Sequence, residues 1–80
     1  MELPLKHPFT NAAGQRIEKL TVRRAKRADM KAAAKYSKDE AEQEDFLFAQ
    51  ITGLTLEDID QLDLADSKAL QDSFRSMVDN

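Results

Sequence analysis

The sequence predicts one small domain of the α+β class, in which an N-terminal β-hairpin is followed by three or four α-helices. Three observations support this fold class. Apolar and polar residues alternate on both sides of a turn within residues 2–24, as they do in a hairpin. Helix-forming residues and capping signals then recur to the end of the chain. The length of 80 residues suits a single domain, which we place at residues 1–80.

The predicted hairpin, residues 2–24, begins with a short edge strand. Leu3 and Leu5 alternate with other residue types. Pro4 confines this strand to the edge of a sheet, because proline donates no backbone hydrogen bond. Residues 10–14 read Thr-Asn-Ala-Ala-Gly and provide the turn that joins the two strands.

The second strand is expected from about residue 16 to residue 24. Ile17 falls on the opposite parity to Leu20, so we expect a bulge or a short register change near Glu18. Two strands alone are not stable in water. Helices must therefore cover one face of the hairpin.

Two helices are expected next, at about residues 27–36 and 38–52. The first is rich in Ala, Lys and Arg, which favour helix, and its apolar stripe consists of Met30, Ala33 and Ala34. Ser37 and Glu40 have the spacing of a capping box at the start of the second helix. Gly53 is the expected left-handed stop of that helix.

The remaining helices are expected at about residues 56–62 and 64–78. Thr55 is a good N-cap for the first of them, with Asp58 at the N3 position. Asp63 can cap the last helix. The core-facing stripe of that helix consists of Leu70, Phe74, Met77 and Val78.

The net charge of -3 hides a strong asymmetry. Residues 1–38 hold ten basic and three acidic residues, a net charge of +7, whereas residues 39–80 hold two basic and twelve acidic residues, a net charge of -10. Such a split can indicate a half that faces nucleic acid. It can also mean that the two halves, or neighbouring copies, attract each other, and the presence of opposite charges in one compact domain favours this second interpretation.

The residue types needed for catalysis or metal binding are scarce. The chain has no cysteine, and its one histidine, His7, precedes a proline at a strand end. Asp58, Asp60 and Asp63 cluster, but apolar residues interleave with them and no glycine follows to form a calcium-binding loop. We therefore expect no catalytic residue, no metal ligand and no cofactor. No apolar run approaches the length of about 20 residues that spans a bilayer, so no membrane partner is expected.

Partner binding is the class of function that the residues leave open. On the predicted helix 38–52, Phe46 points about 160° away from Phe48. Either another helix of the domain covers Phe46, or Phe46 is an exposed aromatic anchor for a partner. The basic run from Arg23 to Arg27 could contact phosphates, but no recognisable nucleic-acid-binding module accompanies it.

With these elements in place, the sequence resembles the tail assembly chaperone family of contractile-tailed phages of the Mu and P2 type. The resemblance rests on two blocks that span about two-thirds of the chain. The first, residues 3–30, reads LPLKHPFTNAAGQRIEKLTVRRAKRADM, and the second, residues 51–78, reads ITGLTLEDIDQLDLADSKALQDSFRSMV. The positions that match the family pattern are fold-forming ones: Gly14, Ile17 to Arg24, Asp29, Met30, Gly53, Leu54, Thr55, Leu62, Asp63, Asp66, Leu70 and Phe74.

The resemblance implies a non-enzymatic function in phage or prophage tail assembly. Such chaperones bind the aggregation-prone tape measure protein and keep it soluble until the tail tube polymerises around it. The resemblance further implies a location in the cytoplasm of the bacterial host, absence from the mature virion, and a frameshifted longer form of the chain as a possible second partner.

The expected exposure of an aromatic residue and of a basic run, and not the family pattern, suggests which residues contact the partner. They are Phe46 with its neighbours Leu47 and Gln50, and the basic residues Arg23, Arg24 and Arg27. Two alternative functions stay open at this point. One is a small nucleic-acid-binding regulator that uses the basic N-terminal half. The other is a minor structural protein of the tail.

Overall fold

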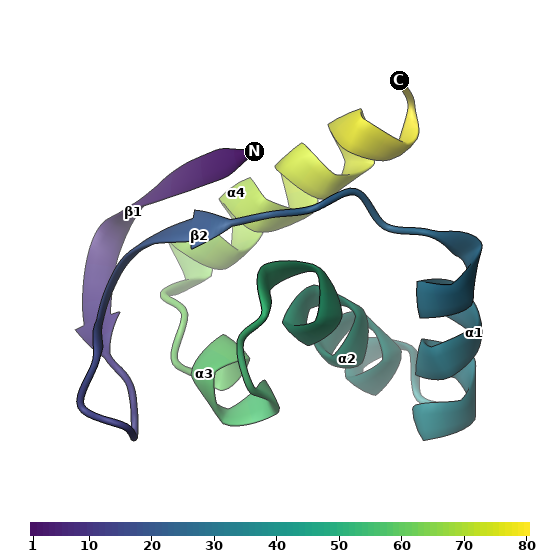
Figure 1. Ribbon diagram of the computed structural model, residues 1–80, viewed down its shortest axis with the longest axis horizontal. Helices are drawn as coiled ribbons and strands as arrows, with labels where there is room; N and C mark the ends of the chain where they lie inside the picture. Colours follow the sequence, from purple (N-terminus) through teal and green to yellow (C-terminus); the bar gives the residue numbers. More distant parts are fainter.

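The computed structural model describes residues 1–80 and has the α+β architecture that the sequence predicts. A two-stranded antiparallel hairpin lies on the left of the molecule in Figure 1, the first helix lies on the right, and the long C-terminal helix runs across the top between them. The elements in chain order are β1 (Glu2–Thr10), β2 (Arg16–Thr21), α1 (Arg27–Tyr36), α2 (Glu40–Thr52), α3 (Leu56–Asp60) and α4 (Leu64–Val78).

The hairpin contains the register change that the sequence predicts near Glu18. Leu3 pairs with Leu20 near the open end, whereas Phe9 pairs with Ile17 near the turn, so the pairing shifts between them. The additional residues lie on β1, opposite Glu18. Such a bulge bends the strand and leaves backbone groups without ladder partners.

The buried carboxylate of Asp66 satisfies two of those backbone groups. The backbone N–H of Lys6 donates to Asp66 Oδ1 at 2.8 Å, and that of His7 donates to Asp66 Oδ2 at 2.9 Å. Asp66 lies in the first turn of α4 and is only 2% exposed. This contact therefore fixes the start of α4 against the bulge of β1.

The start of α2 differs from the prediction. Asp39, not Ser37, is its N-cap and accepts a hydrogen bond from the backbone N–H of Glu42 at 3.0 Å, so the helix begins at Glu40 and not at residue 38. Ser37 instead ends α1: its backbone is extended, and its N–H donates to the carbonyl of Ala33. The capping box predicted for Ser37 and Glu40 is wrong, because an aspartate two residues later competes for the same role.

The other predicted helix signals are present. Gly53 ends α2 with φ of 73°, in the left-handed region. Thr55 Oγ1 accepts from the backbone N–H of Asp58 at 3.1 Å at the start of α3. Asp63 Oδ2 accepts from the backbone N–H of Ala65 at 2.9 Å at the start of α4. However, α3 ends at Asp60, two residues earlier than expected.

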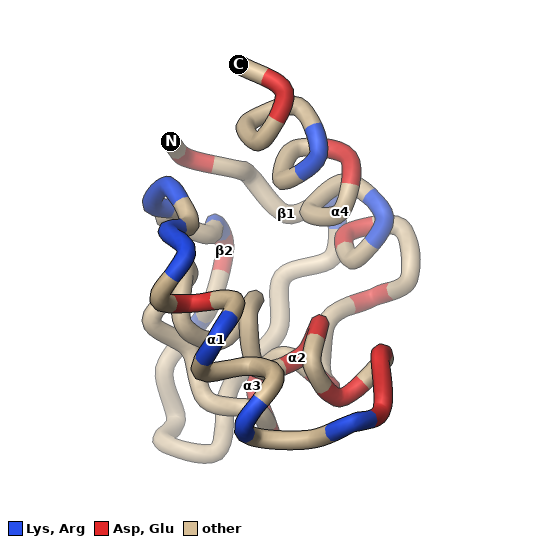
Figure 2. Tube along the Cα trace, turned by 90° about the vertical axis from the view of Figure 1, so that its right-hand side faces the viewer, with Lys and Arg blue, Asp and Glu red and all other residues tan.

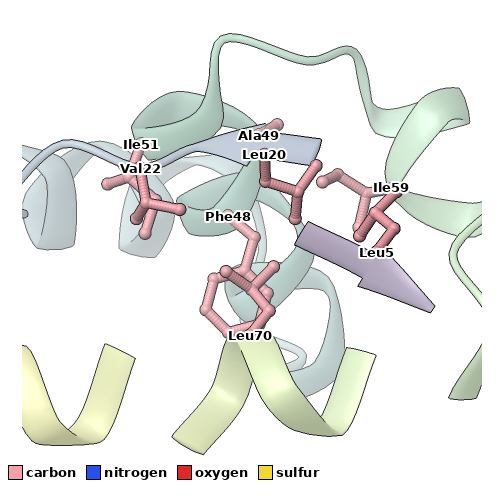
Figure 3. Packing of buried hydrophobic residues seen from close by; sticks show 8 residues of the cluster. All are labelled: Leu5, Leu20, Val22, Phe48, Ala49, Ile51, Ile59 and Leu70. Atoms are coloured by element: carbon pink, nitrogen blue, oxygen red, sulfur yellow. The ribbon is translucent and has the colours of Figure 1, made fainter. Parts of the chain in front are cut away.

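The hydrophobic core lies between the hairpin, α2, α3 and α4 (Figure 3). Leu20 of β2 and Leu70 of α4 are almost fully buried, and Phe48 of α2 lies beside Leu70. The eight residues of the cluster are Leu5, Leu20, Val22, Phe48, Ala49, Ile51, Ile59 and Leu70. This cluster therefore draws on every element except α1, whose buried apolar residue is Ala33.

Val78, which was predicted for the core, lies outside it and is 62% exposed. Met30, from the apolar stripe predicted on α1, is 63% exposed. The reason is that α1 packs against α2 and α4 packs against β1, so no further element covers the sides of α1 and α4 that carry these residues. The apolar stripes were identified correctly, but their ends are not covered.

Candidate partner-binding surface

A mostly apolar groove of about 420 Å³ lies between α1, α2 and α4. Seven of its ten lining residues are hydrophobic. Six of them form three pairs, one on each helix: Met30 and Ala34 on α1, Leu47 and Phe48 on α2, and Phe74 and Val78 on α4. The side of the molecule shown in Figure 2 has α1 on the left, α4 at the upper right and the start of α2 at the lower right. Clefts of this kind accept the apolar face of a helix.

The charged residues around the groove are segregated. Glu40 and Glu44, in the first turns of α2, line one side of the groove. On α1, Arg27 and Lys31 are exposed and precede Ala34 by seven and three residues, which places them beside the apolar stripe on a helix. Figure 2 shows the same separation, with basic residues along α1 and acidic residues at the start of α2.

Arg23, one of the predicted partner contacts, is engaged within the domain. Its guanidinium donates two hydrogen bonds of 2.8 Å to the carboxylate of Asp29. The backbone N–H of Lys26 also donates to Asp29 Oδ2 at 2.8 Å. The Arg23 guanidinium and, after it, the Lys26 amide hold the pKa of Asp29 well below its usual range. The Asp29 carboxylate in turn raises the pKa of Arg23.

Arg24, a second predicted contact, ties the strand–helix junction to the end of α4. Its Nη2 donates to the carbonyl oxygens of Met77 at 3.2 Å and of Asn80 at 3.3 Å. These carbonyls belong to the last turn of α4 and the residues after it, where a cation is favourable. By contrast, Arg27 is exposed and has no hydrogen bond or ion pair within the chain.

The three predicted contacts on α2 fall in different surroundings. Leu47 is half-buried and lines the groove. Phe46 is also half-buried, and its ring stacks on that of Tyr36 with centroids 4.8 Å apart. Gln50 is exposed. Of the two interpretations left open for Phe46, the structure therefore shows partial cover from a helix of the same domain, and the contact of Phe46 with a partner stays a prediction.

The pKa of Asp45 on α2 is raised by its surroundings, which include several other carboxylates. Its partial burial raises the pKa of the Asp45 carboxyl above the ordinary value, and the nearby carboxylates of Asp60 and Glu44 raise it further. No basic side chain offsets this effect, because none forms an ion pair with α2. The nearest candidate on α4 is Arg75, which lines a hollow of about 360 Å³ together with Glu44 but forms no ion pair with it.

Sequence reasoning missed the groove because it assigned the stripe of the last helix to the core and gave the stripe of residues 27–36 no surface of its own. Val78 was expected in the core and Met30 on an apolar stripe, and both instead line the groove and are largely exposed. The signal in the sequence is an excess of apolar residues at the ends of two helical stripes. A domain this small cannot cover all of them, because its surface is large relative to its volume.

Elsewhere in the molecule the hollows are more polar than the groove. No group of three or more His, Asp or Glu side chains is placed to hold a metal ion. No buried side-chain nitrogen or oxygen lacks a hydrogen bond. A second hollow, of about 520 Å³, lies between the hairpin turn and α3, but only four of its ten lining residues are hydrophobic. No helix combines the length and the apolar character required to cross a membrane.

The comparison with protein families identified a match over nearly the whole chain. The model of a family described as "Phage tail assembly chaperone proteins, E, or 41 or 14" matches residues 2–79. The match includes both blocks of the sequence resemblance and the residues between them, so it runs from β1 through α4. The searches of curated proteins and of solved structures returned no significant match.

Proposed function

The chain belongs to the family of phage tail assembly chaperone proteins, and from this premise we propose that it binds the tape measure protein and keeps it soluble until the tail tube polymerises around it. The family match over residues 2–79 is the observation that carries this proposal. The chaperone acts by non-covalent binding and not by catalysis. It works in the cytoplasm of the bacterial host and is absent from the mature virion, and a frameshifted longer form of the chain is a second partner.

The groove between α1, α2 and α4 supports this function. A tape measure protein is expected to be largely helical, and its apolar helical faces aggregate when they are exposed to water. The groove offers such a face a surface lined by Leu47, Phe48 and Phe74. Met30 at the rim adds a flexible, polarizable side chain that adapts to different partner residues.

The predicted contact residues divide into two roles under this proposal. Leu47 and Arg27 contact the tape measure protein, Leu47 from inside the groove and Arg27 from its basic side. Phe46 and Gln50 extend the contact surface beyond the groove on α2. Arg23 and Arg24 hold the junction before α1 in place through Asp29 and the end of α4, and so position Arg27.

Co-expression with the tape measure protein tests the proposal. The measurement is the fraction of tape measure protein that stays in the supernatant after centrifugation, with and without this chain. The proposal predicts that the chain raises this fraction and co-purifies with the tape measure protein. An unchanged fraction would overturn it.

A pair of variants on α1 tests whether the groove is the binding surface. Ala34→Trp places a large ring in the groove and should abolish the gain in solubility. Ala28→Trp makes the same change on the same helix, at an exposed position outside the groove, and should leave the gain intact. Both positions are exposed, so neither change disturbs the core. Equal behaviour of the two variants would place the binding surface elsewhere.

The two rival functions are separated by one measurement each. A minor structural protein of the tail would be abundant in purified tails, whereas the chaperone should be missing from them by mass spectrometry. A nucleic-acid-binding regulator would shift random DNA or RNA in a gel at low salt, with a steep salt dependence. The internal engagement of Arg23 and Arg24 argues against the regulator, because it reduces the charge available to phosphates.

A further inference from the structure

The basic side of the groove is not neutralised within the domain. Arg27 and Lys31 are exposed, and neither takes part in a hydrogen bond or an ion pair of its side chain. At 100° per residue, Arg27 lies about 20° and Lys31 about 60° from Ala34 around the axis of α1. Both cations are therefore available to a molecule that lies on Met30 and Ala34.

The acidic side forms no ion pair within the domain. Glu40 has no partner, and Glu44 Oε1 accepts only from the neutral Nε2 of Gln71, at 3.0 Å. None of the four ion pairs of the chain crosses the groove, since they join His7 to Asp63, Lys19 to Glu2, Arg23 to Asp29 and Lys68 to Asp72. The groove thus separates two uncompensated charges of opposite sign.

Between these charges the lining is apolar, which limits what can occupy the groove. An occupant must bury an apolar stripe on Leu47, Phe48 and Phe74. Its flanks stay near water and meet Arg27 and Lys31 on one side and Glu40 and Glu44 on the other. Complementary charge at such rims favours the correct partner and steers its approach.

We propose that the groove selects an amphipathic helix whose apolar stripe has acidic residues along one flank and basic residues along the other. The acidic flank lies against α1 and the basic flank against the start of α2. This inference rests on the proposed function, and it specifies the chemistry of the tape measure segment that is bound. The charge pattern also fixes the direction in which the helix lies, because reversing the helix exchanges its two flanks.

A second copy of this chain fits this pattern poorly. Large apolar side chains stay exposed on α1, at Met30, and at the two ends of α4, at Leu64 and Val78, which are fourteen residues apart. The continuous apolar face that a second copy could insert is therefore the one on α1, beside Met30 and Ala34. The only acidic residue of α1 is Asp29, which is buried and bound to Arg23. Hence α1 of a second copy presents basic flanks without an acidic one.

The test uses three synthetic peptides of about 20 residues, a length at which helices become stable in water. All three share one apolar stripe. The first has Glu on one flank and Lys on the other, the second has Glu on both flanks, and the third has Lys on both. The wild-type chain should bind the mixed peptide about tenfold more tightly than either uniform peptide, which corresponds to about 1.4 kcal/mol. This preference should disappear near 1 M salt, where the screening length is about 3 Å.

Charge-reversed variants should change the ranking in a defined way. With Glu40→Lys and Glu44→Lys together, both sides of the groove are basic and the all-Glu peptide should bind most tightly. With Arg27→Glu and Lys31→Glu together, both sides are acidic and the all-Lys peptide should bind most tightly. The matched control reverses Glu18 and Glu57, two exposed glutamates outside the groove, and should keep the wild-type ranking.

Any outcome other than these overturns the inference, and each alternative outcome has its own meaning. Equal binding of the three peptides, or one ranking shared by all variants, means that the groove does not read charge. If Ala34→Trp dissociates a dimer of the chain in sedimentation, the groove holds a second copy instead. If the wild-type chain leaves the tape measure protein insoluble, the proposed function fails and the inference fails with it. If the tape measure protein becomes soluble but the rankings do not change, only the inference fails.

Discussion

Charged side chains are paired at one end of this domain and unpaired at the other. The hairpin end consists of β1, β2 and the start of α4, and the groove end consists of α1, the start of α2 and the end of α4. At the hairpin end, Asp66 accepts from two backbone amides and Glu2 pairs with Lys19 at 3.1 Å. At the groove end, Glu40 and Arg27 have no partners and Met30 is largely exposed. The same chain therefore satisfies its polar groups where it builds a core, and leaves charge and apolar surface free where it does not.

We infer from this difference that the residues that stabilise the fold are not the residues that bind a partner. A domain of this size is only marginally stable, and a buried or paired group contributes to that stability. An exposed Met30 or an unpaired Glu40 contributes little to folding, but each is available to a partner. Substitutions at the two ends should accordingly separate folding from binding.

The largest effect is expected at Asp66, where the hairpin end would be broken. Asp66→Asn keeps the size of the side chain but replaces one acceptor oxygen with an NH₂ group that faces a backbone N–H. One amide of the β1 bulge then has no acceptor, so the free energy of unfolding should fall by about 2 kcal/mol. Urea denaturation measures this change.

The matched control for Asp66 is Asp72 on the same helix. Asp72 is exposed and pairs only with Lys68, at 3.2 Å. Asp72→Asn should reduce the free energy of unfolding by no more than about 0.5 kcal/mol. If the two variants were equally stable, Asp66 would not be the residue that fastens α4 to the hairpin.

The Asp29–Arg23 pair lies between the two ends and should give a smaller, pH-dependent effect. Asp29→Ala removes the acceptor for the Lys26 amide at the start of α1 and should reduce the free energy of unfolding at neutral pH by about 1 kcal/mol. The pKa of Asp29 is lowered in the folded chain by the Arg23 guanidinium, so the stabilisation is present above the ordinary aspartate pKa of about 3.9. It is lost as the pH falls towards the lower folded pKa.

The corresponding measurement is the stability of both proteins between pH 7 and pH 2. The difference between wild type and Asp29→Ala should be largest at neutral pH and should shrink below about pH 4. A difference that is independent of pH would mean that the ionised carboxylate of Asp29 is not what orders the start of α1.

The sequence predicted the hairpin end better than the groove end, for physical reasons. Caps at Thr55 and Asp63 and the stop at Gly53 are local, because each depends on a backbone group a few residues away. The contact of Asp66 with Lys6 and His7 joins residues about 60 positions apart, and no local pattern signals it. Whether Met30 and Val78 are buried depends on how α1 and α4 pack, which periodicity does not determine.

The candidate contacts illustrate the same limit. Arg23 and Arg27 look alike in the sequence, as members of one basic run. In the structure Arg23 is committed to Asp29, and Arg27 is free beside the groove. Their difference arises from the helical position of Asp29, which puts its carboxylate within reach of Arg23 and of the backbone at Lys26.

A small gain in stability is expected from a substitution of Asp45, on the acidic helix α2. The folded environment raises the pKa of Asp45, mainly by burial and then through Asp60 and the glutamates of α2. Its ionised form therefore destabilises the folded chain at neutral pH, and this penalty disappears as the pH falls below the ordinary pKa of about 3.9. Asp45→Asn should raise the free energy of unfolding at pH 7 by about 0.5 kcal/mol, and the gain should vanish near pH 3. A loss of stability at pH 7 would show that the acidic side is compensated after all.

The smallest effect on stability is expected at Met30, where the effect on binding should be large. Met30→Gln replaces an exposed apolar side chain with a polar one of similar length that also favours helix, so the free energy of unfolding should change by less than about 0.5 kcal/mol. A partner that buries Met30 would lose apolar contact, and its affinity should fall about tenfold. Urea denaturation and titration with the tape measure protein measure the two quantities on the same sample. Unchanged affinity would show that the exposed stripe of α1 is not part of the interface, whereas a large loss of stability would show that Met30 supports the fold. A change in affinity alone, set against a change in stability alone at Asp66, would assign binding to the groove end and folding to the hairpin end.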